Sequence, residues 1–148
     1  MTKPRKPRFN HVAMTVTPDL LDVAGRKEIL DFYGDVFGWE EMPQMSGDRK
    51  RLVLMAYEFG QFVFLEAGDT PTRANEGDHF GMAVATRDEL DEMLQRARAW
   101  QERDERVRIV DNEVEDFDVL KLSSFYVQFL LPLTVEVQYF DWQQAATA

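Results

Sequence analysis

An internal repeat limits the folds open to this chain more than any other feature of its sequence. Residues 10–16 read Asn-His-Val-Ala-Met-Thr-Val, and residues 78–84 read Asp-His-Phe-Gly-Met-Ala-Val. The two segments hold the only histidines of the chain, His11 and His79. With 148 residues, of which 45% are apolar, the chain can bury one good core. The repeat therefore predicts two similar halves of a single domain.

Each histidine is followed by a glutamate within an apolar segment. The interval from His11 to Glu66 is almost the same as the interval from His79 to Glu136. Imidazole nitrogens and carboxylate oxygens are both ligands of divalent transition metals. The duplicated unit thus predicts a metal site with one histidine and one glutamate from each copy.

Hydrophobic spacing predicts the same order of elements in both halves. Apolar residues recur at helical spacing within residues 29–37, and Gly38 is placed to end that helix. In the second half, Thr86 and Glu89 have the spacing of a capping box. Further strands are predicted at residues 51–57, 61–67, 107–110, 125–130 and 134–140. Each half reads as β-α-β-β-β, although the strand after the first helix, around residues 41–45, is the least marked.

The predicted domain organisation is simple. Residues 1–8 are basic, contain two prolines and lack an apolar pattern, so we expect a solvated arm. Residues 9–142 form the single domain, with module one at about 9–68 and module two at about 77–142. Residues 143–148 are left as a C-terminal tail.

Charge and composition exclude several classes of function. The net charge is −10 and the isoelectric point about 4.6, which argues against nucleic acids and anionic membranes as partners. There is no cysteine, so disulfides, thiolate nucleophiles and cysteine metal ligands are all ruled out. The sequence shows neither a signal peptide nor an apolar run of about 20 residues. We therefore expect a cytoplasmic protein that binds a small molecule.

Strand alternation predicts which way the histidines face. His11 shares a face of its strand with Thr15, and His79 shares one with Gly81, whereas larger residues such as Met14 lie on the opposite face. The large apolar set suits packing beneath the helices. The small set leaves open space beside each histidine.

The same alternation places each glutamate in an open face. If these faces line one concave sheet, they enclose a cavity with aromatic walls and four ionisable groups, which suits a small, partly apolar ligand. The side chains predicted to line this substrate pocket are Thr15, Phe62, Phe64 and Gln138.

Taken singly, each candidate ligand has a simpler interpretation. A histidine at a strand start is often a partly exposed polar residue, and a glutamate in an apolar strand often faces solvent. Two buried carboxylates, however, are costly without a cation between them. A metal site is therefore favoured over a site that is only hydrogen-bonded or has lost its metal.

Five segments together resemble the vicinal oxygen chelate superfamily: residues 10–16, 29–39, 62–66, 78–84 and 133–140. This superfamily includes glyoxalase I, methylmalonyl-CoA epimerase, extradiol dioxygenases, fosfomycin resistance enzymes and bleomycin-binding proteins. The resemblance covers nearly the whole chain. It implies an α+β fold in which two tandem β-α-β-β-β modules form a curled mixed sheet around a central cavity.

The resemblance also implies a ligand set and an activity. His11, Glu66, His79 and Glu136 fall on all four metal positions of the glyoxalase I pattern, which implies one divalent ion of nickel, cobalt, zinc, manganese or iron. The implied chemistry is a lyase or isomerase reaction on a small carbonyl-containing substrate, with Glu66 or Glu136 as the catalytic base. It further implies a homodimer, with each metal held by one chain or by two.

Two alternatives remain open. Extradiol dioxygenases of this superfamily use two histidines and one glutamate on iron, so Glu66 would be surplus in such an enzyme. A non-catalytic binding or resistance protein would instead sequester a hydrophobic small molecule. The chain shows no basic cluster outside its arm for the anionic conjugates that glyoxalase I and the epimerase accept.

Overall fold

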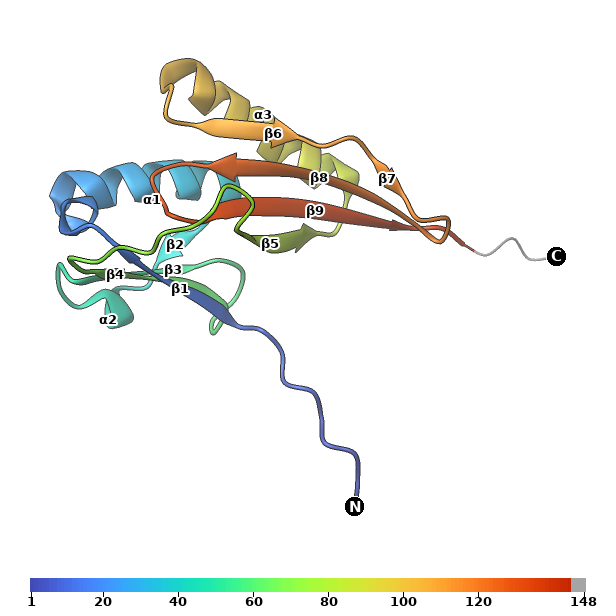
Figure 1. Ribbon diagram of the computed structural model, residues 1–148, viewed down its shortest axis with the longest axis horizontal. Coiled ribbons are helices and arrows are strands. Elements are labelled where there is room, and N and C mark those ends of the chain that lie inside the picture. The colour runs from blue at the N-terminus through green and yellow to red at the C-terminus, as the bar shows by residue number, and fades with distance from the viewer. Residues whose placement is uncertain (145–148) are drawn as a thin grey trace.

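The computed structural model describes residues 1–144 and contains two repeats that share a β-α-β-β-β order, to which each repeat adds short elements of its own (Figure 1). The first repeat contains β1 (His11–Val16), the 3-10 helix η1 (Pro18–Leu21), α1 (Val23–Phe37), β2 (Glu40–Glu41), α2 (Pro43–Ser46), β3 (Arg51–Met55) and β4 (Phe62–Ala67). The second contains β5 (His79–Val84), α3 (Arg87–Arg103), β6 (Arg108–Asp111), β7 (Glu115–Asp116), β8 (Leu120–Gln128) and β9 (Thr134–Trp142). No helix in this part of the chain is long and apolar enough to cross a membrane.

Each repeat forms its own mixed sheet. The strand order is β1-β4-β3-β2 in the first sheet and β5-β9-β8-β6 in the second, with β7 paired to β8. In both sheets the first strand of the repeat runs parallel to the last, and the other pairs are antiparallel. The predicted α+β fold of two tandem β-α-β-β-β modules is thereby confirmed.

The predicted strand around residues 41–45 is wrong in its extent. The strand β2 ends at Glu41, and Pro43 begins the one-turn helix α2. A proline fits the first turn of a helix, where its missing N–H has no partner to lose, but it cannot donate to a sheet. In the second repeat β8 starts at Leu120, earlier than the predicted residue 125.

Local sequence signals account for the ends of both long helices. Asp22 caps α1 by accepting a hydrogen bond from the backbone N–H of Gly25 at 2.7 Å. Gly38 ends α1 in the left-handed conformation, with φ of 73°, which favours glycine. Thr86 and Glu89 form the predicted capping box at the start of α3.

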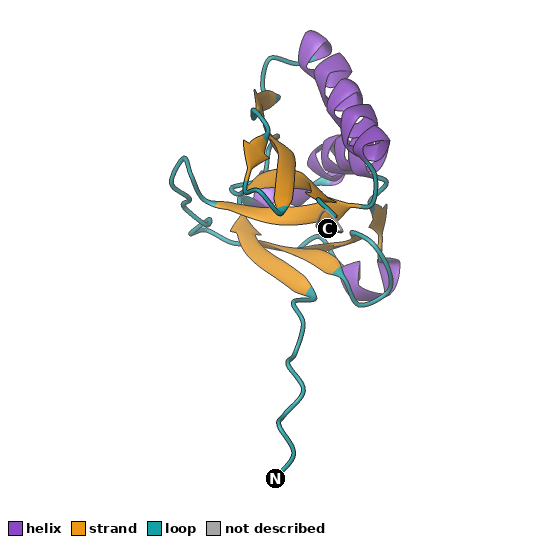
Figure 2. Cartoon of the chain, turned by 90° about the vertical axis from the view of Figure 1, so that its right-hand side faces the viewer, coloured by secondary structure: helices purple, strands orange, loops and turns teal. Residues whose placement is uncertain are grey.

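The two helices pack together and join the repeats. The indole Nε1 of Trp100 on α3 donates to Oδ2 of Asp35 on α1 at 2.7 Å. Tyr33 of α1 is fully buried and donates through its hydroxyl to the carbonyl of Phe129 at 2.7 Å. Figure 2 shows the long helices on one side of the sheets. The core therefore lies between the helices and the sheets.

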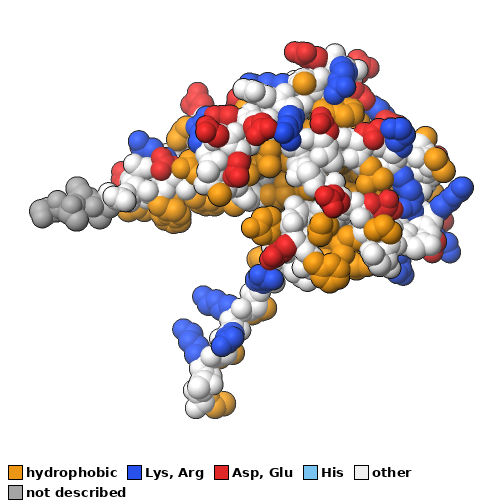
Figure 3. All heavy atoms as spheres, turned by 180° about the vertical axis from the view of Figure 1, so that it is seen from behind, with side chains coloured by type: hydrophobic (Ala, Val, Ile, Leu, Met, Phe, Trp, Pro, Cys, Tyr) orange, Lys and Arg blue, Asp and Glu red, His pale blue; other side chains and the backbone are white. Residues whose placement is uncertain are grey.

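Strand alternation is as predicted. Met14 and Val16 are buried beneath the helices, whereas His11 is exposed on the opposite face of β1. In β5 the exposed residues are likewise His79, Gly81 and Ala83. The outer edges of β1 and β5 carry no strand partner within residues 1–144. The basic N-terminal arm extends away from the body of the molecule (Figure 3).

Candidate functional site

The second repeat brings its histidine and glutamate into contact. Across the parallel pair of β5 and β9, His79 lies opposite Thr134 and Gly81 lies opposite Glu136. The two side chains meet on the diagonal, with 3.1 Å between Nε2 of His79 and Oε2 of Glu136. The carboxylate is buried, with 8% of its side chain exposed, whereas 37% of the histidine side chain is exposed. A buried carboxylate thus faces a solvent-accessible imidazole.

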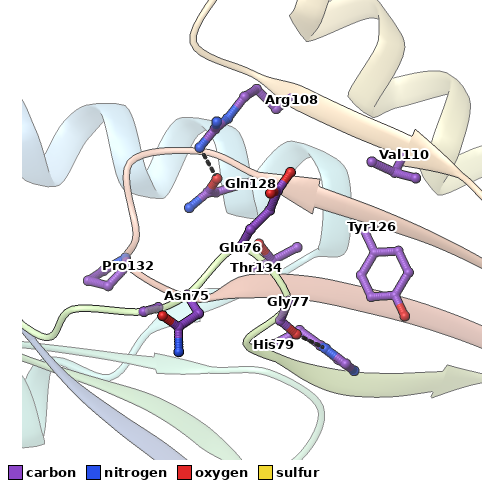
Figure 4. A pocket seen from close by; sticks show the side chains of 11 residues that line it. Asn75, Glu76, Gly77, His79, Arg108, Val110, Tyr126, Gln128, Pro132 and Thr134 are labelled. Carbon is purple, nitrogen blue, oxygen red and sulfur yellow. Dashed lines mark hydrogen bonds between the residues drawn. The ribbon is translucent and has the colours of Figure 1, made fainter.

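The backbone fixes which nitrogen of His79 faces the glutamate. Nδ1 lies 2.8 Å from the carbonyl oxygen of Gly77 (Figure 4), and since a carbonyl only accepts, Nδ1 carries the proton. Nε2 then has a lone pair unless the ring is protonated. Two ligand atoms at right angles, each about 2.1 Å from a metal, are about 3 Å apart. The 3.1 Å separation therefore fits either an imidazolium ion pair or two adjacent ligands of one metal.

Two neighbouring side chains hold Glu136. Gln138 donates from Nε2 to Oε1 of Glu136 at 3.2 Å. Tyr126 lies opposite Glu136 on β8, and its ring meets the His79 ring edge-on at 5.1 Å. The pKa of the Tyr126 phenol is raised, first by burial and then by the charge of Glu136 and a hydrogen bond to it. The phenol stays protonated at neutral pH and can donate to the carboxylate, as outer hydrogen bonds do to metal ligands.

His11 is also hydrogen-bonded through Nδ1, but no glutamate lies beside it. Its Nδ1 lies 2.8 Å from Oδ1 of Asn10, and its ring stacks on Phe62 with 4.9 Å between centroids. Nε2 is therefore again the nitrogen left to act as a ligand. Within residues 1–144, no three histidine or acidic side chains converge on one point. His11 thus does not join His79 and Glu136 in a single chain.

The strand register separates Glu66 from His11. His11 lies opposite Phe62, and Glu66 lies opposite Thr15, four residues further along both strands. At about 3.3 Å per residue this is about 13 Å along the sheet, against about 7 Å between Thr134 and Glu136. The residue of β4 that corresponds in register to Glu136 is Phe64 rather than Glu66. The set of four metal ligands stays a prediction. This register favours His11, His79 and Glu136 as ligands and disfavours Glu66.

The four side chains predicted to line the substrate pocket are divided between the two sheets. Phe62 lines a groove of about 1070 Å³ between the sheets, together with His11. Phe64 lies under the guanidinium of Arg51, 5.9 Å from its ring centroid, and Thr15 lies on the adjacent strand. Only Gln138 is beside Glu136.

A second pocket, of about 620 Å³, lies on the open face of the second sheet and was not predicted. Figure 4 shows side chains from β5, β6, β8 and β9 pointing into it, with the segment before β5 at its rim. The polar residues that line it include Asn75, Glu76, His79, Arg108, Tyr126, Gln128 and Thr134. The residues of this set that lie on strands have the parity that faces the pocket, but their proximity depends on pairing across four strands.

Comparison of the sequence with protein-family profiles and with curated proteins finds no match. The structure, in contrast, is similar to many solved structures. A protein from Bacillus anthracis assigned to the glyoxalase family has 17% identity and a TM-score of 0.64, over 95% of this chain and 100% of that one. The fosfomycin resistance protein FosX from Listeria monocytogenes, in complex with Mn(II) and sulfate, has 16% identity and a TM-score of 0.62, over 91% of each chain.

A third similar structure is a glyoxalase/bleomycin resistance protein/dioxygenase from Alicyclobacillus acidocaldarius. It has 17% identity and a TM-score of 0.60, over 93% of this chain and 95% of that one. All three proteins are of the class that the sequence resembles. The protein therefore has the fold of the vicinal oxygen chelate superfamily.

Proposed function

We propose that the protein is a divalent-metal-dependent vicinal oxygen chelate enzyme, a lyase or isomerase that moves a proton on a small carbonyl-containing substrate. The observation that carries this proposal is the contact between His79 Nε2 and the buried carboxylate of Glu136. With Nδ1 committed to Gly77, the imidazole presents a lone pair beside a negative charge. That arrangement is unfavourable unless a proton or a metal ion lies between the two atoms.

The metal, when bound, would polarise a substrate carbonyl and stabilise the negative charge that forms on its oxygen. His79 and Glu136 would hold it, and Gln138 and Tyr126 would keep the carboxylate in position. Glu66 is exposed on the open face of β4, so we propose it as the proton acceptor rather than as a fourth ligand. Glu136 remains the other candidate base.

We propose further that a second copy of the chain supplies His11 to the site, in a homodimer. The edges of β1 and β5 are unpaired within residues 1–144, and unpaired edges favour association with another chain. His11 stands on one of these edges and His79 on the other. A two-fold dimer that joins the edges would bring the same two residues together at two equivalent sites.

A second candidate function is an extradiol-type dioxygenase. In the first repeat the register places Phe64, and not Glu66, at the position that corresponds to Glu136. Without Glu66 the ligands are two histidines and one carboxylate, the set that non-haem iron oxygenases use. Such a set keeps positions free for both a catechol and dioxygen. Oxygen uptake by the iron-loaded protein in the presence of catechol would favour this candidate over proton transfer.

Metal reconstitution tests the main proposal. Protein stripped with a chelator and reloaded separately with nickel, cobalt, zinc, manganese or iron should retain about one equivalent per chain of at least one ion, measured by elemental analysis. Retention should be lost at acid pH, because protons compete with the metal ion for its ligands. Retention of none of the five ions would overturn the enzyme proposal and favour a binding protein that sequesters its ligand.

Substrate screening then tests the reaction. The metal-loaded protein should exchange solvent deuterium into a carbon next to a carbonyl, followed by NMR, without consuming oxygen. Glu66→Gln should slow this exchange while the metal content stays the same. Exchange at the wild-type rate in Glu66→Gln would transfer the role of base to Glu136.

A further inference from the structure

We propose that Arg108 and Gln128 form an oxyanion-binding subsite, so that the substrate of this enzyme carries a carboxylate or phosphate group. This inference rests on the proposed function for the reacting end of the substrate, which would lie at His79. The anionic end would lie across the same 620 Å³ pocket. The pocket would then select a small molecule with an acid group at the Arg108 end and an oxygen function at the His79 end, several atoms from the acid group.

Strand pairing places the two ends in one row of side chains. Arg108 lies opposite Gln128 on β6 and β8, and His79 lies opposite Thr134 on β5 and β9. The pairing of β8 with β9 continues to within one residue of Gln128 and Thr134. Three strand spacings of about 4.8 Å separate the backbones of Arg108 and His79 by about 14 Å. Both side chains line the same pocket of about 620 Å³, which leaves room for a small substrate.

The guanidinium of Arg108 is available to a ligand. Its Nη2 donates to Oε1 of Gln128, which fixes the side chain along the row. Among residues 1–144, no carboxylate lies within 4.0 Å of its nitrogens, although Arg98 and Arg106 nearby are both paired with acids. A guanidinium has five donors arranged as a fork that matches an oxyanion, and Gln128 uses one side of it. In a chain of net charge −10, a cation that lines a pocket without a carboxylate beside it is suited to bind an anion.

Glu76 is the acidic residue that lines the same pocket. It lies in the segment before β5, and its side chain reaches toward the Gln128 end in Figure 4. It forms no ion pair with Arg108. Its charge opposes a bound oxyanion, so its removal should strengthen binding while the removal of Arg108 should weaken it. The two variants therefore move the affinity in opposite directions.

Inorganic phosphate and metal-free protein give a test that does not depend on the metal. Phosphate is titrated into the wild-type protein, and NMR follows the arginine Nε–Hε signals and the backbone amides of residues 75–77. We expect saturable shifts of the Arg108 signal, at least 10-fold weaker binding in Arg108→Gln and tighter binding in Glu76→Gln. Arg98→Gln, which removes a cation paired with Asp111, is the matched control and should bind phosphate as the wild type does.

The outcomes separate this inference from the proposed function. Absence of shifts at Arg108 in the wild type, or equal affinity in Arg108→Gln, overturns the subsite. The same preparations are reloaded with manganese, and Arg108→Gln should keep the metal content of the wild type. Phosphate binding that depends on Arg108 in a protein that retains no metal would support the subsite and overturn the enzyme.

Discussion

The two repeats share a backbone plan but differ in what they place beside their histidines. In both, the histidine opens the first strand and is hydrogen-bonded through Nδ1. Two residues beyond the partner of that histidine, the last strand carries Glu136 in the second repeat and Phe64 in the first. The first repeat thus offers a lone imidazole with an aromatic wall, and the second offers an imidazole with a buried carboxylate.

This difference shows that the duplication preserves topology more strictly than chemistry. Glu136 has Gln138 and Tyr126 to satisfy its charge, so it can be buried. Phe64 instead receives the guanidinium of Arg51 over its ring. Neither half can complete a three-ligand site alone, because the first half has only a histidine and the second has a histidine and a glutamate. This is why we propose a site that two copies of the chain share.

The largest expected effect comes from the position at which the halves differ most. Glu136→Gln should lower metal affinity by more than 100-fold, because it removes an anionic ligand, whereas losing an outer hydrogen bond costs about 10- to 100-fold. The matched change in the other half, Phe64→Leu, should leave metal affinity within a few-fold of the wild type. Isothermal titration of the metal-free proteins measures both. Similar losses in the two variants would show that the halves contribute equally.

The next effect tests whether the two histidines meet across chains. His11→Ala and His79→Ala should each abolish stoichiometric metal retention. If each site combines His11 of one copy with His79 of the other, mixed and refolded variants should recover about a quarter of the wild-type metal content, because half the dimers are mixed and each has one intact site. Elemental analysis of the mixture checks this. No recovery, with mixed dimers demonstrated by mass spectrometry, would place both histidines in one chain.

A smaller effect is expected at Tyr126. Tyr126→Phe removes the phenol that can donate to Glu136 and should weaken metal binding by about 10-fold.

The same side chain should affect how stability depends on pH. In the wild type, the raised pKa of Tyr126 means that the folded state holds the phenolic proton more tightly than the unfolded state. The contribution of this phenol to stability is therefore complete below the unfolded pKa of about 10 and is lost as the pH rises through the higher folded value. Thermal unfolding from pH 8 to 11 should show a smaller loss in Tyr126→Phe.

The opposite face of β9 should affect folding and leave the metal site unchanged. Val137 is fully buried next to Glu136 but points away from it, toward the helices. Val137→Ala should lower the free energy of unfolding by about 1–3 kcal/mol through lost burial. Denaturant unfolding of the metal-free protein measures the loss, and metal affinity should stay within a few-fold of the wild type. A large loss of affinity at unchanged stability would contradict the strand alternation.

Much of the fold could be predicted because its signals are local. The capping box of Thr86, the end of α1 at Gly38 and the alternation around both histidines each depend on a few adjacent residues. The strand β2 was overestimated because Pro43 begins a helix there. Local pattern, hydrophobic alternation and the repeat predicted two β-α-β-β-β modules, and the resemblance implied the superfamily fold.

The candidate site was predicted less completely because it depends on register. The nearly equal intervals from each histidine to its glutamate suggest that Glu66 and Glu136 are equivalent. The last strand, however, starts at Phe62 in the first repeat and at Thr134 in the second, so it begins closer to its histidine in the first. This offset arises in the connections and cannot be read from the strands. The row from His79 to Arg108 was missed for the same reason, since it requires the pairing of four strands.

The smallest expected effect on metal binding is at Glu66, and it bears most directly on that offset. Glu66→Gln should change metal affinity by less than about 3-fold, because the backbone of Glu66 lies about 13 Å along the sheet from the residue opposite His11. It is exposed, so the stability of the protein should also change little. Titration of the metal-free variant measures the affinity, with Glu136→Gln as the positive control. A loss of more than about 10-fold would make Glu66 a fourth ligand, restore the equivalence of the halves and close the open position that a dioxygenase would need.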